Sequence, residues 1–121
     1  MPDHRRKLGD WGEGLALDFL LRKGDCLIAR NVRTRFGEID LITRRGNRLV
    51  FVEIKTRSSN EFGHPEESVN SSKRRKLVAS AQSYLDAHPE IDGDWQIDVI
   101  AIRSFPDRPP EVLHIEDAVT G

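Results

Sequence analysis

Cysteine, aromatic residues and long hydrophobic runs are all scarce in this sequence. The single cysteine, Cys26, cannot form an intrachain disulfide and has no cysteine partner for zinc, and the apolar residues after it predict a place in the core. No run of about 18 apolar residues exists for a membrane span, and the polar segment Met1–Lys7 is not followed by the apolar stretch of an export signal. We therefore expect one cytoplasmic domain, residues 1–121.

The net charge of −1 hides an uneven distribution of charge along the chain. Residues 1–76 contain 17 Lys and Arg against 11 Asp and Glu, whereas residues 77–121 contain two against nine. A basic surface suits a polyanion such as nucleic acid. Its cations would be Arg30, Arg33, Arg35, Arg44, Arg45, Arg48, Arg57 and the run Lys73-Arg74-Arg75-Lys76. Charge runs are also common on ordinary solvated surfaces, so the charge pattern alone leaves both interpretations open.

A β-hairpin is predicted from Gly37–Ile42 and Leu49–Lys55. The dipeptide Gly46-Asn47 between these apolar runs favours a two-residue turn, which fixes the register of the strands. Side chains alternate along a strand, so one face is nearly continuous apolar surface, and a slip of one residue would expose it. The pairs on that face are Ile39 with Ile54, Leu41 with Val52 and Thr43 with Val50.

The same register sets two carboxylates opposite each other. Asp40 lies opposite Glu53, and Glu38 lies opposite Lys55, all on one face. Like charges in paired positions repel across roughly 4.5–5.5 Å, so either one carboxylate takes up a proton or a cation lies between them. A hard divalent ion suits such oxygen ligands. We favour the ion over two solvated carboxylates with a lysine partner, because the apolar Phe51 shares this face.

Two helices are predicted. The first spans about Asp10–Lys23, where Gly24 is placed to end it in a left-handed C-cap. The second begins at Ser71 or Ser72 and runs to about Ala87. The apolar stripes that indicate these helices are Trp11, Leu15 and Phe19 in the first, and Leu77, Ala81, Tyr84 and Leu85 in the second.

Three further strands are predicted around the hairpin and the second helix. They cover Cys26–Val32, Trp95–Ile102 and Val112–Ile115, while Ser58–Val69 has the composition of a loop. The resulting order is α-β-β-β-α-β-β, which predicts an α/β layer structure.

Glu13 is a third carboxylate in an unexpected position. On a helical wheel it shares its arc with Ala16, Leu17 and Leu20, where an unpaired ionised group would cost several kcal/mol. We expect Glu13 to meet a cation, a metal-bound water or a backbone donor. The alternative is that its stem packs and its carboxylate reaches solvent.

The motifs of this chain resemble those of the bacterial YraN family over nearly its whole length. They are Gly9-(x)2-Gly12-Glu13-(x)2-Ala16, Arg30-Asn31-Val32-Arg33, Gly37-Glu38-Ile39-Asp40-Leu41-Ile42, Phe51-Val52-Glu53-Ile54-Lys55-Thr56-Arg57 and Ala81-(x)2-Tyr84-Leu85. That family is similar to archaeal Holliday-junction resolvases and is placed with the restriction-endonuclease-like nucleases. The resemblance implies a mixed central β-sheet with helices on both faces. Where members tend to have Arg-Phe-Asp, this chain has Gln96-Ile97-Asp98, so we assign Asp98 to structure.

The resemblance implies a metal-dependent endonuclease acting on DNA, with branched or junction DNA among its substrates. Asp40, Glu53 and the Ile54 carbonyl would hold Mg²⁺, with Mn²⁺ as a substitute, and Lys55 would stabilise the developing charge. Glu13 would act through a metal-bound water, and Gln82, expected on the inward side of its helix, would contact the same waters. The predicted contacts to DNA are Arg33, Arg35, Arg57, Lys73, Arg74 and Lys76. Junction resolvases act as twofold dimers, so the resemblance adds a homodimer to the expectations.

Two other classes of protein fit the same residues. A non-catalytic nucleic-acid-binding or assembly module would keep the scaffold and the basic surface, and its affinity would fall with salt. A small structural protein that dimerises through its apolar strands would depend on neither metal nor nucleic acid.

Overall fold

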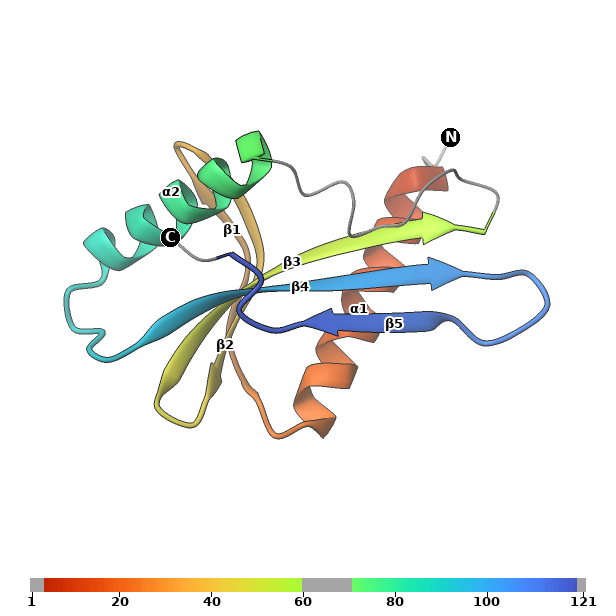
Figure 1. Ribbon diagram of the computed structural model, residues 1–121, viewed down its shortest axis with the longest axis horizontal. Coiled ribbons are helices and arrows are strands. Elements are labelled where there is room, and N and C mark those ends of the chain that lie inside the picture. Colours follow the sequence, from red (N-terminus) through yellow and green to blue (C-terminus); the bar gives the residue numbers. More distant parts are fainter. Residues whose placement is uncertain (1–3, 60–70, 120–121) are drawn as a thin grey trace.

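A five-stranded mixed sheet lies between two helices in the computed structural model, which describes residues 4–59 and 71–119 (Figure 1). The predicted loop at Ser58–Val69 falls largely on residues 60–70, outside the described residues. The elements are α1 (His4–Arg22), β1 (Cys26–Thr34), β2 (Gly37–Arg45), β3 (Arg48–Ser58), α2 (Ser71–Ala87), β4 (Trp95–Ser104) and β5 (Glu111–Ile115). This order confirms the predicted α/β class.

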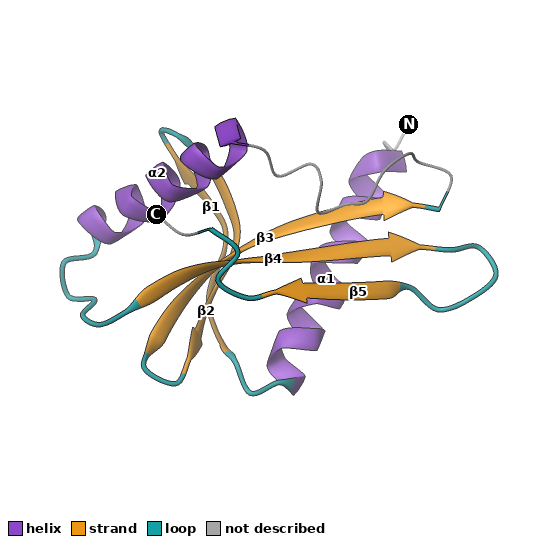
Figure 2. Cartoon of the chain, in the orientation of Figure 1, coloured by secondary structure: helices purple, strands orange, loops and turns teal. Residues whose placement is uncertain are grey.

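The strand order in the sheet follows the sequence, from β1 at one edge to β5 at the other. Neighbouring strands are antiparallel except β3 and β4, which are parallel and are connected through α2 (Figure 2). A parallel pair needs such a crossover, and its helix then covers one face of the sheet. The mixed sheet therefore consists of an antiparallel unit, β1–β2–β3, and an antiparallel pair, β4–β5, joined by the parallel pairing of β3 with β4.

The register of β2 against β3 is the predicted one, from Leu41 opposite Val52 to Arg45 opposite Arg48. The turn at Gly46-Asn47 connects them, and Gly46 has the positive φ of 62° that such a turn needs. The hairpin was predictable because one apolar face and one short turn dictate the same pairing.

β2 and β3 stop pairing beyond Leu41 and Val52. β2 continues to pair with β1 as far as Gly37, whereas β3 continues beside β4 as far as Ser58, so the sheet divides into two arms (Figure 1). We call this division the fork. The predicted pairs beyond it, Asp40 with Glu53, Ile39 with Ile54 and Glu38 with Lys55, do not belong to the β2–β3 ladder.

Each face of the sheet carries its own apolar cluster. Leu41, Val50 and Val52 pack with residues of α1, and Ile42 and Phe51 pack with residues of α2 on the other face. The second cluster also holds Leu77 and Ala81 of α2 and partly buried Tyr84 and Leu85, as the helical stripe predicted. Ile39 was predicted on the face of Leu41 but lies in the α2 cluster, in the part of β2 that has left β3 and pairs with β1 alone.

The inward face of α1 differs by one position from the predicted stripe. Ala16 and Leu20 are completely buried, whereas Trp11 is 42% exposed. The helix also begins at His4, earlier than predicted, and ends as predicted with Gly24 at a φ of 102°. Small residues face the sheet because α1 packs closely on it, which the spacing of large apolar residues cannot reveal.

Cys26 was predicted in the core and is exposed instead. Cys26 begins the edge strand β1, and the next two residues of that strand, Leu27 and Ile28, are also exposed, at 39% and 43%. A run of apolar residues at a sheet edge therefore does not imply burial.

Gly12 and Gly14, both on α1, give a matched test of how closely this helix packs on the sheet. A Cβ on Gly12 would overlap Thr56 Oγ1 and lie 3.1 Å from Thr56 Cβ and Cγ2, whereas Gly14 has open space around it. We expect Gly12→Ala to lower the free energy of unfolding by about 1–3 kcal/mol. Gly14→Ala should raise it by roughly 0.5–1 kcal/mol, since alanine favours the helix. Urea unfolding of both variants measures this, and equal effects of the same sign would contradict the packing.

Candidate functional site

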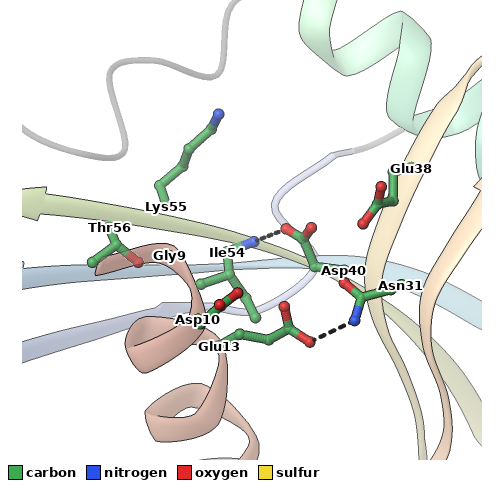
Figure 3. A pocket seen from close by; sticks show the side chains of 9 residues that line it. All are labelled: Gly9, Asp10, Glu13, Asn31, Glu38, Asp40, Ile54, Lys55 and Thr56. Atoms are coloured by element: carbon green, nitrogen blue, oxygen red, sulfur yellow. Dashed lines mark hydrogen bonds between the residues drawn. The ribbon is translucent and has the colours of Figure 1, made fainter. Parts of the chain in front are cut away.

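Asp40 lies where the fork opens, and its side chain replaces the missing backbone pairing. The amide N–H of Ile54 donates to Asp40 Oδ2 at 2.8 Å, which ties the two arms together (Figure 3). A pocket of about 390 Å³ adjoins this bond, between the fork and the N-terminal half of α1. It is lined by Gly9, Asp10, Glu13, Asn31, Glu38, Asp40, Ile54, Lys55 and Thr56.

The pocket carries an excess of negative charge. Four of its lining residues are carboxylates, and Lys55 is the one lysine or arginine among them. Burial, and next the charge of Glu53, raises the pKa of Asp40 to about 7, while the hydrogen bond from Ile54 opposes the rise. Glu13 and Glu38 raise this pKa further. A bound cation would relieve both the burial cost and the repulsion, as would a proton on Asp40.

Glu13 reaches the pocket from α1, as its position on the helical wheel predicted. Its Oε1 accepts hydrogen bonds from Asn31 Nδ2 at 3.1 Å and from Arg30 Nη2 at 3.2 Å and Nε at 3.3 Å. Asn31 adopts a φ of 51°, a left-handed conformation that asparagine tolerates. The expected cationic partner of Glu13 is thus Arg30, an arginine that the sequence had suggested for the basic surface.

Glu53 lies close to Asp40 but does not line the pocket. Its side chain is nearly buried, and its Oε1 is 3.0 Å from Lys73 Nζ and 3.6 Å from Lys55 Nζ. Burial acts to lower the pKa of Lys73, but the charge and hydrogen bond of Glu53 outweigh it and raise that pKa. The first turn of α2 therefore supplies a counter-ion to the predicted metal ligand, and Lys73 contacts a carboxylate where a DNA contact was expected.

The predicted residues come together only in part. Asp40, Glu13, Ile54 and Lys55 line one pocket, although Figure 3 shows the ammonium of Lys55 extending away from the two carboxylates. Gln82 was expected on the inward side of α2, but it is exposed, and its amide donates to Asp86 Oδ1 at 3.4 Å. That expectation was wrong because Leu77, Ser80 and Ala81 set the buried face of the helix.

A second polar cluster lies on β4 and β5. Within the described part of the chain, Asp98, His114 and Glu116 are the one group of three metal-ligand side chains whose ligand atoms all lie within 4.8 Å of one another. The guanidinium of Arg45 already fills this group, with Nη1 3.1 Å from Asp98 Oδ2 and 2.8 Å from Glu116 Oε1. Its Nε is 2.8 Å from the buried Asp25. An arginine at the centre marks an ion-pair network.

Asp98 is the fully buried centre of that network. It accepts hydrogen bonds from Gln96 Nε2 at 2.7 Å, His114 Nε2 at 2.7 Å and the Asp117 N–H at 2.9 Å. Burial raises its pKa, but these donors and Arg45 together lower it below the ordinary value. These contacts tie Asp98 to residues of β2, β4 and β5 and agree with the structural role expected for it. The network was missed from sequence, where a charged residue within the apolar run of β4 was its main signal.

The basic residues divide into a bound set and an exposed set. Arg30 and Arg45 hold carboxylates within the fold, and Arg48 contacts Asp94 and Gln96. Of the cations predicted to contact DNA, Arg33, Arg35, Arg74 and Lys76 are exposed, although Arg33 Nε also lies 3.9 Å from Glu38 Oε2, and Arg57 is partly buried. The basic surface is therefore smaller than the charge pattern suggested, and it gathers on β1, its turn and the start of α2.

Comparison with known proteins places relatives of this chain among many bacteria. Residues 12–102 match the sequence model described as "Uncharacterised protein family UPF0102". A UPF0102 protein of Roseiflexus castenholzii is 44% identical over 103 residues, which cover 84% of this chain and 83% of that protein. A UPF0102 protein of Chloroflexus aurantiacus is 42% identical over 120 residues, which cover 98% of this chain and 98% of that protein. One of Geobacter metallireducens is 39% identical over 118 residues, which cover 98% of this chain and 96% of that protein. Among the described helices, none combines the length and apolar character that a membrane crossing requires.

Proposed function

This chain belongs to the uncharacterised protein family UPF0102, and from its own site we propose that it is a metal-dependent endonuclease that hydrolyses phosphodiester bonds in DNA, branched DNA included. The observation that carries the proposal is Asp40 at the fork. Burial, then the neighbouring charge of Glu53, and to a lesser degree the pocket carboxylates Glu13 and Glu38 raise its pKa to about 7. Keeping Asp40 ionised in this pocket without a cation costs free energy, and pKa shifts of this kind are characteristic of functional sites.

The donor atoms around Asp40 suit a magnesium ion. Carboxylate and main-chain carbonyl oxygens are the ligands that Mg²⁺ prefers, so Asp40, Glu53 and the carbonyl of Ile54 would hold it, and Mn²⁺ would substitute. When bound, the ion supplies a water of lowered pKa and stabilises negative charge on the phosphate. Glu53 would exchange its ion pairs with Lys55 and Lys73 for this contact.

The other residues of the site position groups and supply charge. Lys55, released from Glu53, would place its ammonium where negative charge develops on the phosphate. Glu13 is fixed by Arg30 and Asn31, so it would orient a water at the opposite wall of the pocket. The exposed cations Arg33, Arg74 and Lys76 would bind neighbouring phosphates, with an affinity that falls as salt rises.

A second function is favoured by the ion pairs of Glu53. With both lysines on its carboxylate, the predicted metal ligand is neutralised within the fold. A module that binds nucleic acid without cutting it would keep this arrangement and would use the same exposed arginines. Such a module would bind equally well in Mg²⁺ and in chelator.

Cleavage assays separate the two functions. Wild type, Glu53→Gln and Lys55→Met are incubated with labelled single-stranded, duplex, flap and four-way-junction DNA, in Mg²⁺, in Mn²⁺ and in chelator. The nuclease cuts at least one of these in either metal and none in chelator, and each variant is expected to be about 10²-fold slower. Gly14→Ala serves as the matched control, because it lies on α1 away from any contact. Binding by wild type without cleavage on any substrate would select the module instead.

A further inference from the structure

An aromatic side chain is displayed at the tip of the β1–β2 hairpin. Phe36 is 45% exposed, and the guanidinium carbon of Arg35 lies 5.2 Å from the centre of its ring. A pocket of about 410 Å³ opens beside it, between the hairpin tip and α2. Its lining residues are Arg35, Phe36, Ala79, Gln82, Ser83 and Asp86. The pocket thus has one aromatic wall, one cation and a polar rim.

The tip is held in place by hydrogen bonds and by its contact with α2. Thr34 Oγ1 donates to the carbonyl of Gly37 at 2.8 Å and accepts from the Phe36 N–H at 3.1 Å. The hydroxyls of Thr34 and Ser80 are hydrogen-bonded at 3.1 Å, which joins the tip to the helix. Phe36 is therefore fixed on a braced turn, and a ligand that stacks on its ring would not have to order the loop first.

The tip leads directly into β2, the strand that carries two residues of the carboxylate pocket. Phe36 is the last turn residue before β2, and Glu38 and Asp40, which follow it by two and four residues, line that pocket. Four residues of extended strand span roughly 13 Å, which is about four base steps of a nucleic-acid strand at 3.4 Å each. Arg33, whose side chain is 89% exposed, flanks the tip on β1. A strand with one phosphate at Asp40 would therefore reach the ring of Phe36 within about four nucleotides.

We propose that this second pocket binds one unpaired base of the nucleic acid, stacked on Phe36, and this rests on the proposed function. Aromatic rings stack on any base for about 1–3 kcal/mol. Gln82, Ser83 and Asp86 offer donors and acceptors to the edge of the base, and Arg35 is placed for the adjoining phosphate. A base inside an intact duplex is not available for such stacking. The substrate class that follows is DNA with unpaired nucleotides within a few nucleotides of the cleavage position.

Binding measured in chelator tests this pocket without cleavage. The probes are a labelled duplex with a short single-stranded flap and the same duplex fully paired, titrated by fluorescence anisotropy. Phe36→Ala should bind the flap about 5- to 100-fold more weakly than wild type and the paired duplex equally well, while Phe36→Trp should bind the flap as wild type does. Leu113→Ala is the matched control, since Leu113 is an equally exposed apolar residue, 48% exposed, on β5.

Abasic substitution then locates the stacked base. Single abasic residues are placed in turn along the flap, and one position is expected to weaken wild type but not Phe36→Ala, because ring and base act as a pair. An added fluorescence decrease of Phe36→Trp on binding supports the same contact. Equal flap affinity of wild type and Phe36→Ala would overturn the pocket and leave the nuclease standing if cleavage persists. A wild type that neither binds nor cuts any DNA would overturn the proposed function, and the pocket with it.

Discussion

Asp40→Asn is expected to unfold at a higher temperature than wild type above pH 7 and yet to lose cleavage by about 10³-fold. The loss follows from the removal of a metal-ligand charge, worth several kcal/mol in the transition state. The gain follows from the cost of keeping Asp40 ionised in a half-buried site beside Glu53, Glu13 and Glu38. An asparagine oxygen can still accept the hydrogen bond from Ile54, so the fork should keep its tie.

The pH dependence of this gain has a definite sign. The pKa of Asp40 is about 7 in the folded protein and about 3.8 as a model value for the unfolded chain. Between these values the folded state retains a proton that the unfolded state has released, so wild type loses stability as the pH rises from 4 to 7. Asp40→Asn should therefore gain roughly 1–3 kcal/mol at pH 8 and almost nothing at pH 4.

Thermal melts of both proteins from pH 4 to pH 8 in chelator measure the effect. A gain of this size corresponds to a melting temperature about 3–15 °C higher for a chain of this length. Asp10→Asn is the matched control, since Asp10 lines the same pocket but is exposed. A lower melting temperature for Asp40→Asn at pH 8 would contradict the electrostatic account of the site.

Arg45→Met is expected to destabilise the fold by about 3–5 kcal/mol. Its guanidinium bridges Asp25 and Asp98, two carboxylates with no exposed surface, and also reaches Glu116. Removing one partner of a buried ion pair leaves an uncompensated buried charge, which costs far more than the pair itself contributes. Asp98 retains its other donors, so most of the cost should fall on Asp25, whose other side-chain donor is Thr43.

Urea unfolding of Arg45→Met and Arg45→Lys tests the network. Lysine keeps the charge but lacks the planar fork that bridges two carboxylates, so its loss should be intermediate. Arg44→Met, the neighbouring position on β2, should change the stability by less than about 1 kcal/mol. If Arg45→Met were as stable as Arg44→Met, the network would not hold β2 to β4 and β5 as its distances indicate.

The sequence predicted the elements of this fold because local signals agreed with one another. The apolar face and the Gly46-Asn47 turn specify one register, and Gly24 ends α1 where its backbone needs a left-handed residue. Glu13 could be singled out because a charge on an apolar helical arc needs a partner. Each of these inferences uses neighbours in the chain or one hairpin.

The remainder depended on contacts between distant segments. Where β2 leaves β3 is decided by the competing pairings with β1 and β4, which no single hairpin reveals. Lys73 reaches Glu53 from the start of α2, a contact between separate elements. Arg45 was taken for a surface cation because its partners, Asp25 and Asp98, are scattered along the sequence. The predicted and observed sites therefore differ mainly in their ion pairs between distant segments, and much less in secondary structure.

Calorimetric titration of Mn²⁺ into wild type and Asp40→Asn at pH 7.5 tests the central claim most directly, namely that the fork holds a divalent cation. Wild type is expected to bind Mn²⁺ saturably, Asp40→Asn about tenfold or more weakly, and the Asp10→Asn control as wild type does. Equal affinity in wild type and Asp40→Asn, or no saturable binding by wild type, would contradict that claim.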